Sequence, residues 1–347
     1  MLCVAAPHWR AAGLELDVLE TNPDVGHFAD QLEASGFRVL RLPLTKRPRD
    51  VGRLKQLMQR ERYDVVHIHT ERADLIPGLA ARLAGIPVVI RTVHHIFPYD
   101  GVLRMRKRAE RRLNRALGTR YLCNSKSGSS NEHSTLNNPH RLVYNWFDDE
   151  HFTPPSEEQR AAARLALGVR DDELAFVSVG GCAEYKNHDL ILRALQDVPE
   201  VIYLHAGPER DDSERRLATE LGVADRARFL GVVPDARDVF YAADVYLMPS
   251  TIEGFGVAAV EALGCGVPAI FSDRPALWDL KGMVPATWVP LASGLLADAM
   301  RSAANRSDLA RREEGAEASQ LVRSRFGVAQ GAQGYLDAYR DALTLRR

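Results

Sequence analysis

Long apolar runs are missing from this 347-residue sequence. No stretch approaches the roughly 18 apolar residues that a membrane-spanning helix needs. The first residues also lack the basic segment, followed by an apolar one, that marks a secretory signal. We therefore predict a globular protein that stays in the cytoplasm.

Cysteine is scarce, and neither sign of charge is in excess. The four cysteines, at positions 3, 123, 182 and 265, form no C-x-x-C pair, which argues against a zinc ribbon or a disulfide framework and indicates a reducing setting. The chain has 45 basic and 46 acidic side chains and a formal net charge of −1. Because binding by counterion release needs a basic surface, we expect no nucleic-acid partner.

Short β-rich runs alternate with helical stretches along the whole chain. The first half contains GLELDVLET, RVLRLP, DVVHIH, PVVIRTVH, RYLCNS and LVYN, and the second half contains LAFVSVGG, VIYLHAGP, ARFLGVV, ADVYLMPS and VPAIFSD. Several runs are almost continuously apolar, as expected when helices cover both faces of a parallel sheet. We predict an α/β fold of two Rossmann-like, doubly wound parallel-sheet domains that face a cleft.

A polar segment with two prolines, NWFDDEHFTPP at residues 145–155, separates the two halves. The SEEQ that follows is a capping box that opens a helix through Ala166. We place one domain at 1–150, a second at 151–326 and a final helix at 327–347 that packs back toward the first domain. The opening MLCVAAPHWRAAG reads as the middle of a helix that runs into a strand, so the chain is expected to begin late.

The most informative stretch is PSTIEGFGVAAVEALGCGVP, residues 249–268, which ends a strand, turns and enters a helix. Gly254 and Gly256 allow backbone N–H groups to approach a ligand, and the helix start adds N–H donors, so a diphosphate fits here. Glu253 precedes the helix and Glu261 lies about two turns into it, where carboxylates would bind hydroxyls. Taken singly, each glutamate is as easily a helix cap or a solvated side chain.

The pattern E-G-F-G-x3-x-E-A-x-x-C-G-x-P resembles the E-x7-E signature of the retaining GT-B glycosyltransferases of family 4, the glycosyl transferases group 1. DVVHIHT, VVIRTVHH, YNWFDDEHF and the terminal RSRFGVAQGAQGYLDAYRDAL continue the resemblance in family order. Only the start differs, since the family's first strand and glycine-rich loop would precede Met1.

The resemblance implies that Glu261 binds the ribose hydroxyls of a nucleotide and that Glu253 lies beside the donor sugar and the reacting centre. Backbone N–H groups of the turn would contact the sugar and phosphates, and these belong to Gly254, Phe255, Gly256 and Val257. For Phe255 the alternative is a packing residue at the helix start.

A second phosphate contact is suggested by VGGCAEYKNHD, residues 179–189. We predict that a strand ends at Gly180 and that Lys186 precedes a helix capped by Asn187, where the lysine can neutralise a leaving diphosphate. On spacing alone a solvated lysine is an equal alternative. Resemblance to G-R-x-x-x-x-K favours the phosphate role, but Gly181 stands where the family usually carries a phosphate-binding arginine, so one cationic contact is lost or comes from elsewhere.

The pocket for the base is expected at RARFLGVVPD, where we predict that residues 229–233 end a strand and Pro234 starts a helix. By resemblance alone, backbone groups of Leu230 and Val232 would read the base. Without the resemblance, the segment is an ordinary buried strand and turn.

Histidines of the first half come in two pairs, His67 with His69 and His94 with His95. No third cysteine, histidine or carboxylate recurs at matching spacing, so we predict no metal site. The resemblance places His94 against the donor sugar, at the carboxyl end of a strand. His67 is expected to be a hydrogen-bonded structural residue.

Residues 103–120, LRMRKRAERRLNRALGTR, carry eight basic side chains and one acidic side chain. We predict a basic amphipathic helix whose apolar face is formed by Leu103, Ala109, Leu113, Ala116 and Leu117. Such a helix could contact anionic lipid at the inner face of the membrane and would suit a lipid-linked acceptor. A solvated charged face is the plainer alternative.

Together, the residues and the resemblance predict a glycosyltransferase that moves a sugar from a nucleoside diphosphate sugar, with UDP favoured, to a hydroxyl acceptor. Retention, independence of metals and cofactors, and a pathway to polysaccharide, glycolipid or natural-product glycosides follow from the resemblance. We expect Glu253, Lys186 and His94 to be catalytic. The alternatives are a non-catalytic nucleotide-binding relative and a GT-B sugar-nucleotide epimerase; a nicotinamide oxidoreductase is disfavoured because no G-x-G-x-x-G opens a βαβ unit.

Overall fold

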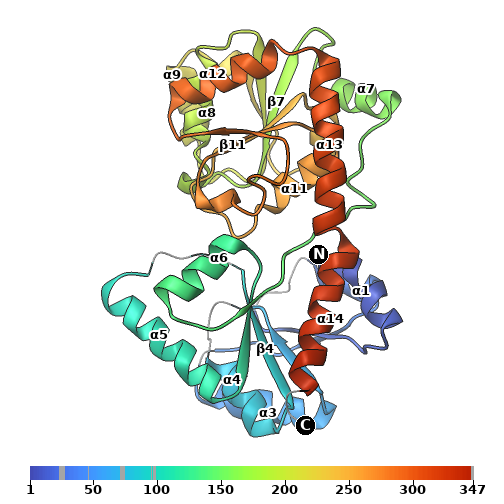
Figure 1. Ribbon diagram of the computed structural model, residues 1–347, viewed down its shortest axis with the longest axis vertical. Coiled ribbons are helices and arrows are strands. Elements are labelled where there is room, and N and C mark those ends of the chain that lie inside the picture. The colour runs from blue at the N-terminus through green and yellow to red at the C-terminus, as the bar shows by residue number, and fades with distance from the viewer. Residues whose placement is uncertain (23–27, 46, 71–74, 95, 97–98, 345–347) are drawn as a thin grey trace. The chain divides into compact units, whose positions relative to one another are not determined.

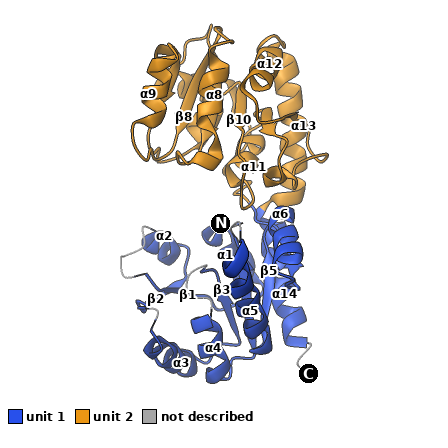
Figure 2. Ribbon diagram, turned by 90° about the vertical axis from the view of Figure 1, so that its left-hand side faces the viewer, with its two compact units in different colours: residues 1–146, 328–347 blue, residues 147–327 orange. Residues whose placement is uncertain are grey.

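The computed structural model describes residues 1–22, 28–45, 47–70, 75–94, 96 and 99–344 (Figure 1). The chain divides into two compact units (Figure 2). Unit 1 comprises residues 1–146 and 328–347, and unit 2 comprises residues 147–327. The carboxyl-terminal helix therefore belongs to the same unit as the amino-terminal part of the chain.

Unit 1 consists of parallel strands and the helices that connect them. Its helices are α1 (Leu2–Ala11), α2 (Ala29–Ala34), α3 (Arg49–Glu61), α4 (Leu75–Ala84), α5 (Gly101–Ala116), α6 (Lys126–Ser130), the π-helix η1 (Asn131–Thr135) and α14 (Val328–Thr344). Its strands are β1 (Asp17–Glu20), β2 (Arg38–Arg41), β3 (Val65–Ile68), β4 (Val88–Val93), β5 (Thr119–Cys123) and β6 (Arg141–Leu142).

The strands of unit 1 form two parallel sheets rather than the single sheet that the sequence pattern predicts. One has the order β1-β2 and the other β3-β4-β5-β6. Both sheets share the same cores, because Val18 and Val65 pack in one apolar cluster and Leu19 and Val66 pack in another. The apolar pattern of these strands therefore predicts which of their faces are buried.

Unit 2 has one parallel sheet covered by helices. Its helices are α7 (Glu157–Ala166), η2 (Glu184–Lys186), α8 (His188–Leu195), α9 (Ser213–Glu220), η3 (Ala224–Arg226), α10 (Arg237–Ala242), α11 (Val257–Gly264), η4 (Pro275–Leu277), α12 (Ser293–Ala304) and α13 (Asp308–Phe326). Its strands are β7 (Leu174–Val179), β8 (Val201–Ala206), β9 (Ala227–Phe229), β10 (Val245–Met248), β11 (Ala269–Ser272) and β12 (Thr287–Val289).

The order of strands in unit 2 is β12-β11-β10-β7-β8-β9, with every pair parallel. The chain leaves β7 in one direction for β8 and later returns to the other side of β7 with β10. The order therefore reverses between β7 and β10, and ligands of open α/β sheets bind beyond the carboxyl ends of the strands at such a switch point. The loops that follow β7 and β10 are the natural place for a site.

Local sequence signals explain several element ends. Ser156 and Gln159 form the predicted capping box of α7, since each side chain bonds the other residue's backbone N–H. β6 covers Arg141–Leu142 and not the predicted LVYN, and β12 was not predicted. No helix among the described residues is both long and apolar enough to cross a lipid bilayer.

Candidate active site

Two loops meet at the switch point of unit 2. The loop after β7 carries Asn187, and the loop after β10 carries Pro249 and Thr251. Asn187 Nδ2 donates to the Pro249 carbonyl over 2.7 Å and to Thr251 Oγ1 over 2.9 Å. Asn187 was predicted to cap α8, but its side chain makes no capping bond, because it is used to join the two loops.

Lys186 and Glu253 form an ion pair between these loops, with 2.7 Å from Nζ to Oε1. Both side chains are largely buried. Lys186 ends the short helix η2 and reaches back over Gly180, where an added Cβ would lie 3.5 Å from Nζ. The sequence predicted that Lys186 contacts phosphate and that Glu253 lies beside the sugar, and the structure brings the two side chains into direct contact.

The start of α11 follows the turn that contains Glu253 and Gly254. Gly256 is the N-cap residue with φ of 78°, and a Cβ there would lie 2.8 Å from Leu277 Cδ2, so both the conformation and the space require glycine. α11 then begins at Val257. The Phe255 ring is buried edge-on against Phe326, with 5.1 Å between centroids, which confirms the packing interpretation of this side chain.

Glu261 lies in the second turn of α11 and is part-buried. Burial raises the pKa of its carboxyl group to about 7, and the nearby Asp235 and Asp148 act in the same direction. A carboxyl group shifted this far by its surroundings marks a candidate functional position, since a merely solvated glutamate would keep its ordinary value.

The prediction for Leu230 and Val232 is wrong in its local structure. β9 ends at Phe229, and α10 begins only at Arg237, so Pro234 does not start a helix. The Val232 side chain is 75% exposed. A role for backbone groups of Leu230 and Val232 in reading a base stays a prediction.

Glycines let the backbone pack closely at the carboxyl edge of the sheet. An added Cβ on Gly207 would lie 2.1 Å from the Gly180 carbonyl oxygen, and the Gly207 N–H donates to the Gly231 carbonyl over 2.8 Å. A Cβ on Gly181 would lie 3.3 Å from Pro208 Cγ. The loop after β7 is therefore held against the loop after β8.

Polar residues also follow three neighbouring strands of unit 1. His69, His94 and Asn124 come directly after β3, β4 and β5. A hydrogen bond of 2.8 Å joins His69 Nδ1 to His94 Nε2, and Asn124 Nδ2 donates to the His94 carbonyl over 3.5 Å. Burial lowers the pKa of His69 to about 3, so this ring is neutral. His69 and Asn124 therefore both hold His94. The sequence analysis did not single out Asn124, although its position directly after a strand could be seen in the sequence.

His67 is a structural residue, as predicted. Its Nδ1 bonds the Tyr339 hydroxyl over 2.8 Å and its Nε2 bonds Thr92 Oγ1 over 2.7 Å. Burial lowers the pKa of His67 well below its ordinary value. His95 lies outside the described residues.

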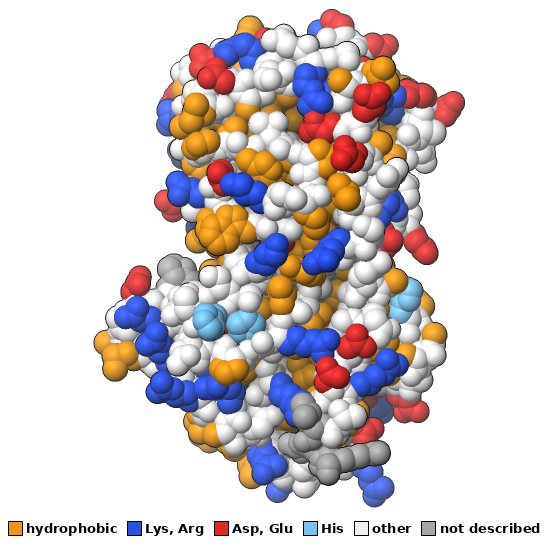
Figure 3. All heavy atoms as spheres, in the orientation of Figure 1, with side chains coloured by type: hydrophobic (Ala, Val, Ile, Leu, Met, Phe, Trp, Pro, Cys, Tyr) orange, Lys and Arg blue, Asp and Glu red, His pale blue; other side chains and the backbone are white. Residues whose placement is uncertain are grey.

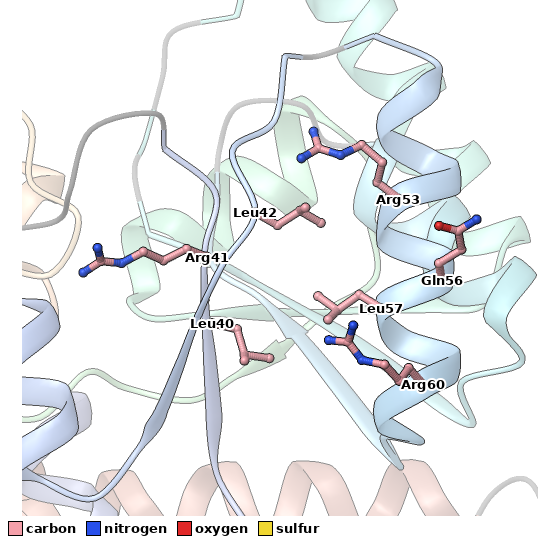
Figure 4. Close-up of a pocket in the computed structure, with 7 residues that line it drawn as sticks. All are labelled: Leu40, Arg41, Leu42, Arg53, Gln56, Leu57 and Arg60. Carbon is pink, nitrogen blue, oxygen red and sulfur yellow. The ribbon is translucent and has the colours of Figure 1, made fainter.

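A separate pocket of about 430 Å³ lies between β2 and α3 in unit 1 (Figure 4). Figure 4 shows that Leu42 and Leu57 point toward one another across it, whereas Arg41 points away. Arg53 bonds the Pro43 carbonyl over 2.9 Å, and Arg60 bonds Glu61. None of the predicted site residues lines this pocket.

Two family models match the chain. The model described as Glycosyltransferase Family 4 matches residues 4–173, and the model described as Glycosyl transferases group 1 matches residues 159–281. The chain belongs to glycosyltransferase family 4. The second match contains Lys186, Glu253 and Glu261, the residues that the fold gathers around the switch point.

Curated relatives support this membership. A D-inositol 3-phosphate glycosyltransferase of Mycolicibacterium smegmatis is 31% identical over 258 residues, which are 68% of this chain and 56% of the relative. The UDP-Gal:alpha-D-GlcNAc-diphosphoundecaprenol alpha-1,3-galactosyltransferase of Escherichia coli is 25% identical over 271 residues, 73% of this chain and 70% of the relative. The match covers about half the length of the Mycolicibacterium smegmatis relative. It covers a similar share of a protein of the same name from Mycobacterium marinum.

Solved structures show that this family 4 chain has the GT-B fold of two Rossmann-like domains. Anabaena HepE in complex with UDP superposes with a TM-score of 0.84 at 20% identity and covers 98% of this chain and 94% of its own. A glycosyltransferase from Rickettsia africae gives a TM-score of 0.83 at 14% identity, with coverage of 98% and 93%.

Proposed function

We propose that this family 4 protein transfers a sugar from a nucleoside diphosphate sugar to a hydroxyl acceptor. The Lys186–Glu253 pair carries the proposal, because it presents an ammonium group at the topological switch point beside the start of α11. As the bond between the sugar and the diphosphate breaks, negative charge grows on the phosphate. Lys186 and the positive end of the α11 dipole would oppose that charge.

The other site residues fit distinct parts of a donor. Glu261 would accept hydrogen bonds from ribose hydroxyls, and the backbone around Gly254 and Gly256 would contact the sugar and the diphosphate. We further propose retention without a metal ion, in which the departing phosphate oxygen accepts the proton of the acceptor on the same face of the sugar. A contact of His94 with the donor sugar stays a prediction.

A UDP-sugar is the favoured donor. The names of the E. coli relative and of the HepE complexes with UDP, and with UDP and glucose, support uridine. The E. coli relative is named for an acceptor on a diphosphoundecaprenol carrier, which supports a lipid-linked acceptor and a pathway to polysaccharide or glycolipid.

Calorimetric titration tests the donor site and the donor together. The protein is titrated with UDP-glucose, GDP-glucose and ADP-glucose, and the titrations are repeated with Glu261→Ala and with Glu317→Ala, a matched change at an exposed position of α13. We expect saturable binding of the uridine compound, lost in Glu261→Ala and kept in Glu317→Ala. Equal binding by both variants would show that the donor site lies elsewhere.

A non-catalytic nucleotide-binding role is the second candidate, and Gly181 favours it. This residue has no side chain to offer a cation beside Lys186. Incubation with the donor that binds and analysis of the products separates the candidates. Release of UDP supports transfer or hydrolysis, an altered sugar on an intact or released nucleotide supports an epimerase, and binding without any product supports the non-catalytic role.

The basic helix α5 is amphipathic, and most of its predicted apolar face is exposed. Buried positions of α5 are polar: Arg111 pairs with Glu132 over 3.1 Å, and Asn114 is also inside. The exposed side carries an apolar stripe at helical spacing, formed by Val102, Met105, Ala109, Leu113 and Ala116. Basic side chains flank it, and Figure 3 shows Lys and Arg gathered over this part of the unit, with apolar side chains at its outer end.

We propose that this stripe contacts anionic lipid at the inner face of the membrane, where a lipid-linked acceptor would lie. Val102 and Met105 are 83% and 69% exposed, so lipid contact would remove much apolar surface from water.

Vesicle sedimentation tests the membrane contact. Binding to phosphatidylglycerol vesicles is expected to fall by about tenfold in Met105→Glu, because the change removes apolar area and adds a repelled charge. Leu165→Glu makes the same kind of change at an 82% exposed position of α7 and should leave binding unchanged. A loss of equal size in both variants, or none in either, would contradict the proposal.

A further inference from the structure

Unit 2 brings together a cysteine and two histidines from three separate segments. Cys182 lies in the loop after β7, His188 is the first residue of α8, and His205 lies in β8. Each of these side chains exposes 5% of its surface or less. Their candidate ligand atoms all lie within 4.8 Å of one another, and Cys182 Sγ is 3.8 Å from His205 Nε2.

The two imidazole rings have polar atoms that the protein contacts leave unused. Nδ1 of His188 and Nδ1 of His205 are buried and have no hydrogen-bond partner among the described residues. His205 Nε2–H donates to the Gly180 carbonyl over 2.9 Å. Buried polar atoms without partners are costly and uncommon, so a cluster with two of them calls for a ligand.

We propose that Cys182, His188 and His205 bind a zinc ion. One thiolate sulfur and two imidazole nitrogens suit Zn²⁺, whose ligands lie about 2.0 to 2.3 Å from the metal, so that small shifts from the observed separations close the site. The unprotonated Nδ1 of His205 binds the metal, while its Nε2–H keeps the hydrogen bond to the Gly180 carbonyl and so orients the ring. The Cys182 thiol releases its proton to solvent.

Glu214 supplies the fourth ligand. It stands in the first turn of α9, and its carboxylate acts electrostatically on the Cys182 thiol. When the zinc ion replaces the proton of the Cys182 thiol, the Glu214 carboxylate lies beside a positive ion. Four protein ligands make a closed site of the structural kind, without an open position for a substrate.

The consequence concerns the loop that carries Lys186. Cys182 and His188 flank Lys186 in sequence, and His205 belongs to the neighbouring strand β8. A metal bound to all three would hold both ends of this loop against the sheet and fix the backbone from which Lys186 reaches Glu253. The ion would therefore stabilise unit 2 and the donor loop without taking part in sugar transfer, and its binding does not depend on the proposed function.

The metal itself is the first probe. The full chain is treated with a chelator and dialysed, and Zn²⁺ is added with elemental analysis of the bound metal. We expect one zinc ion per chain and a rise in Tm of several degrees, because the ion binds the folded state. Cobalt should give a thiolate-to-metal charge-transfer band and the strong visible bands of tetrahedral Co²⁺.

Variants of the proposed ligands test whether zinc binds at this cluster. Cys182→Ala should weaken zinc binding by about 100-fold or more and abolish the thiolate band, whereas Cys265→Ala, at another buried cysteine of unit 2, should keep both. Glu214→Gln changes a part-exposed ligand, folds without a buried cavity and should weaken binding with the thiolate band retained. Absence of stoichiometric binding in the unmodified chain, or full binding by Cys182→Ala, would overturn the proposal.

Discussion

Glu261→Gln is expected to stabilise the protein by about 2 kcal/mol at pH 8 and to leave stability nearly unchanged at pH 5. Burial raises the pKa of the folded carboxyl group to about 7, against an ordinary value of 4.5. Between these values the folded state holds a proton that the unfolded state has released, so the free energy of unfolding falls as the pH rises. Glutamine carries no charge at any of these pH values, so the variant does not lose this part of its free energy of unfolding as the pH rises.

Denaturant unfolding at pH 5, 6, 7 and 8 measures the effect in the original protein, in Glu261→Gln and in Glu317→Gln, the same change at an exposed glutamate. The free-energy difference should grow from pH 5 to pH 7 and then level off, and it should be absent in Glu317→Gln. A difference that stays constant with pH would show that the gain comes from packing and not from the charge.

The same variant should lose affinity for UDP by about 30-fold at pH 8, because charge-assisted hydrogen bonds to the ribose hydroxyls are each worth about 1.5 to 3 kcal/mol. In the original protein, binding should strengthen as the pH rises through 7, since the carboxylate is the better acceptor. Glu261→Gln should show no such dependence. A gain in stability combined with a loss of binding would identify Glu261 as a residue kept for function.

The sequence predicted the parts of the fold that depend on local chemistry. Nearly continuous apolar runs predicted most of the strands, and the capping box of Ser156 and Gln159 predicted the start of α7. The glycine turn at Gly256 was predicted because its conformation requires glycine. These features are decided by residues within one turn or one strand, which a single sequence shows directly.

Contacts between segments that lie far apart in the chain could not be predicted from the sequence. The Lys186–Glu253 pair joins residues that are far apart in the chain, and its partners became visible only through the strand order of unit 2. The cluster of Cys182, His188 and His205 has no local spacing signal either. The burial of Arg111 beside Glu132 is another contact between separate segments that the sequence did not show.

Opposite effects on UDP binding are expected from the two members of the Lys186–Glu253 pair. Lys186→Met removes the cation that would face the diphosphate and should weaken UDP binding by about tenfold, or 1.4 kcal/mol. Glu253→Gln removes the negative charge that lies 2.7 Å from Nζ, so the ammonium group no longer has to leave a carboxylate, and UDP should bind about fivefold more tightly. Two residues that merely stabilised the fold would change binding in the same direction.

Turnover should fall in both variants, because each group would act on the charge that develops as the donor bond breaks. We expect UDP-glucose hydrolysis or transfer to drop by about 100-fold in Lys186→Met, the usual loss when one donor to a developing anion is removed. Lys281→Met is the matched control, since Lys281 is an exposed lysine of the same unit and is paired with Asp273. Tighter UDP binding together with slower turnover in Glu253→Gln would mean that the carboxylate serves the transition state and not the bound ground state. Weaker UDP binding in that variant would instead mean that Glu253 is needed to hold Lys186 in place, and the carboxylate would lose its proposed role at the reacting centre.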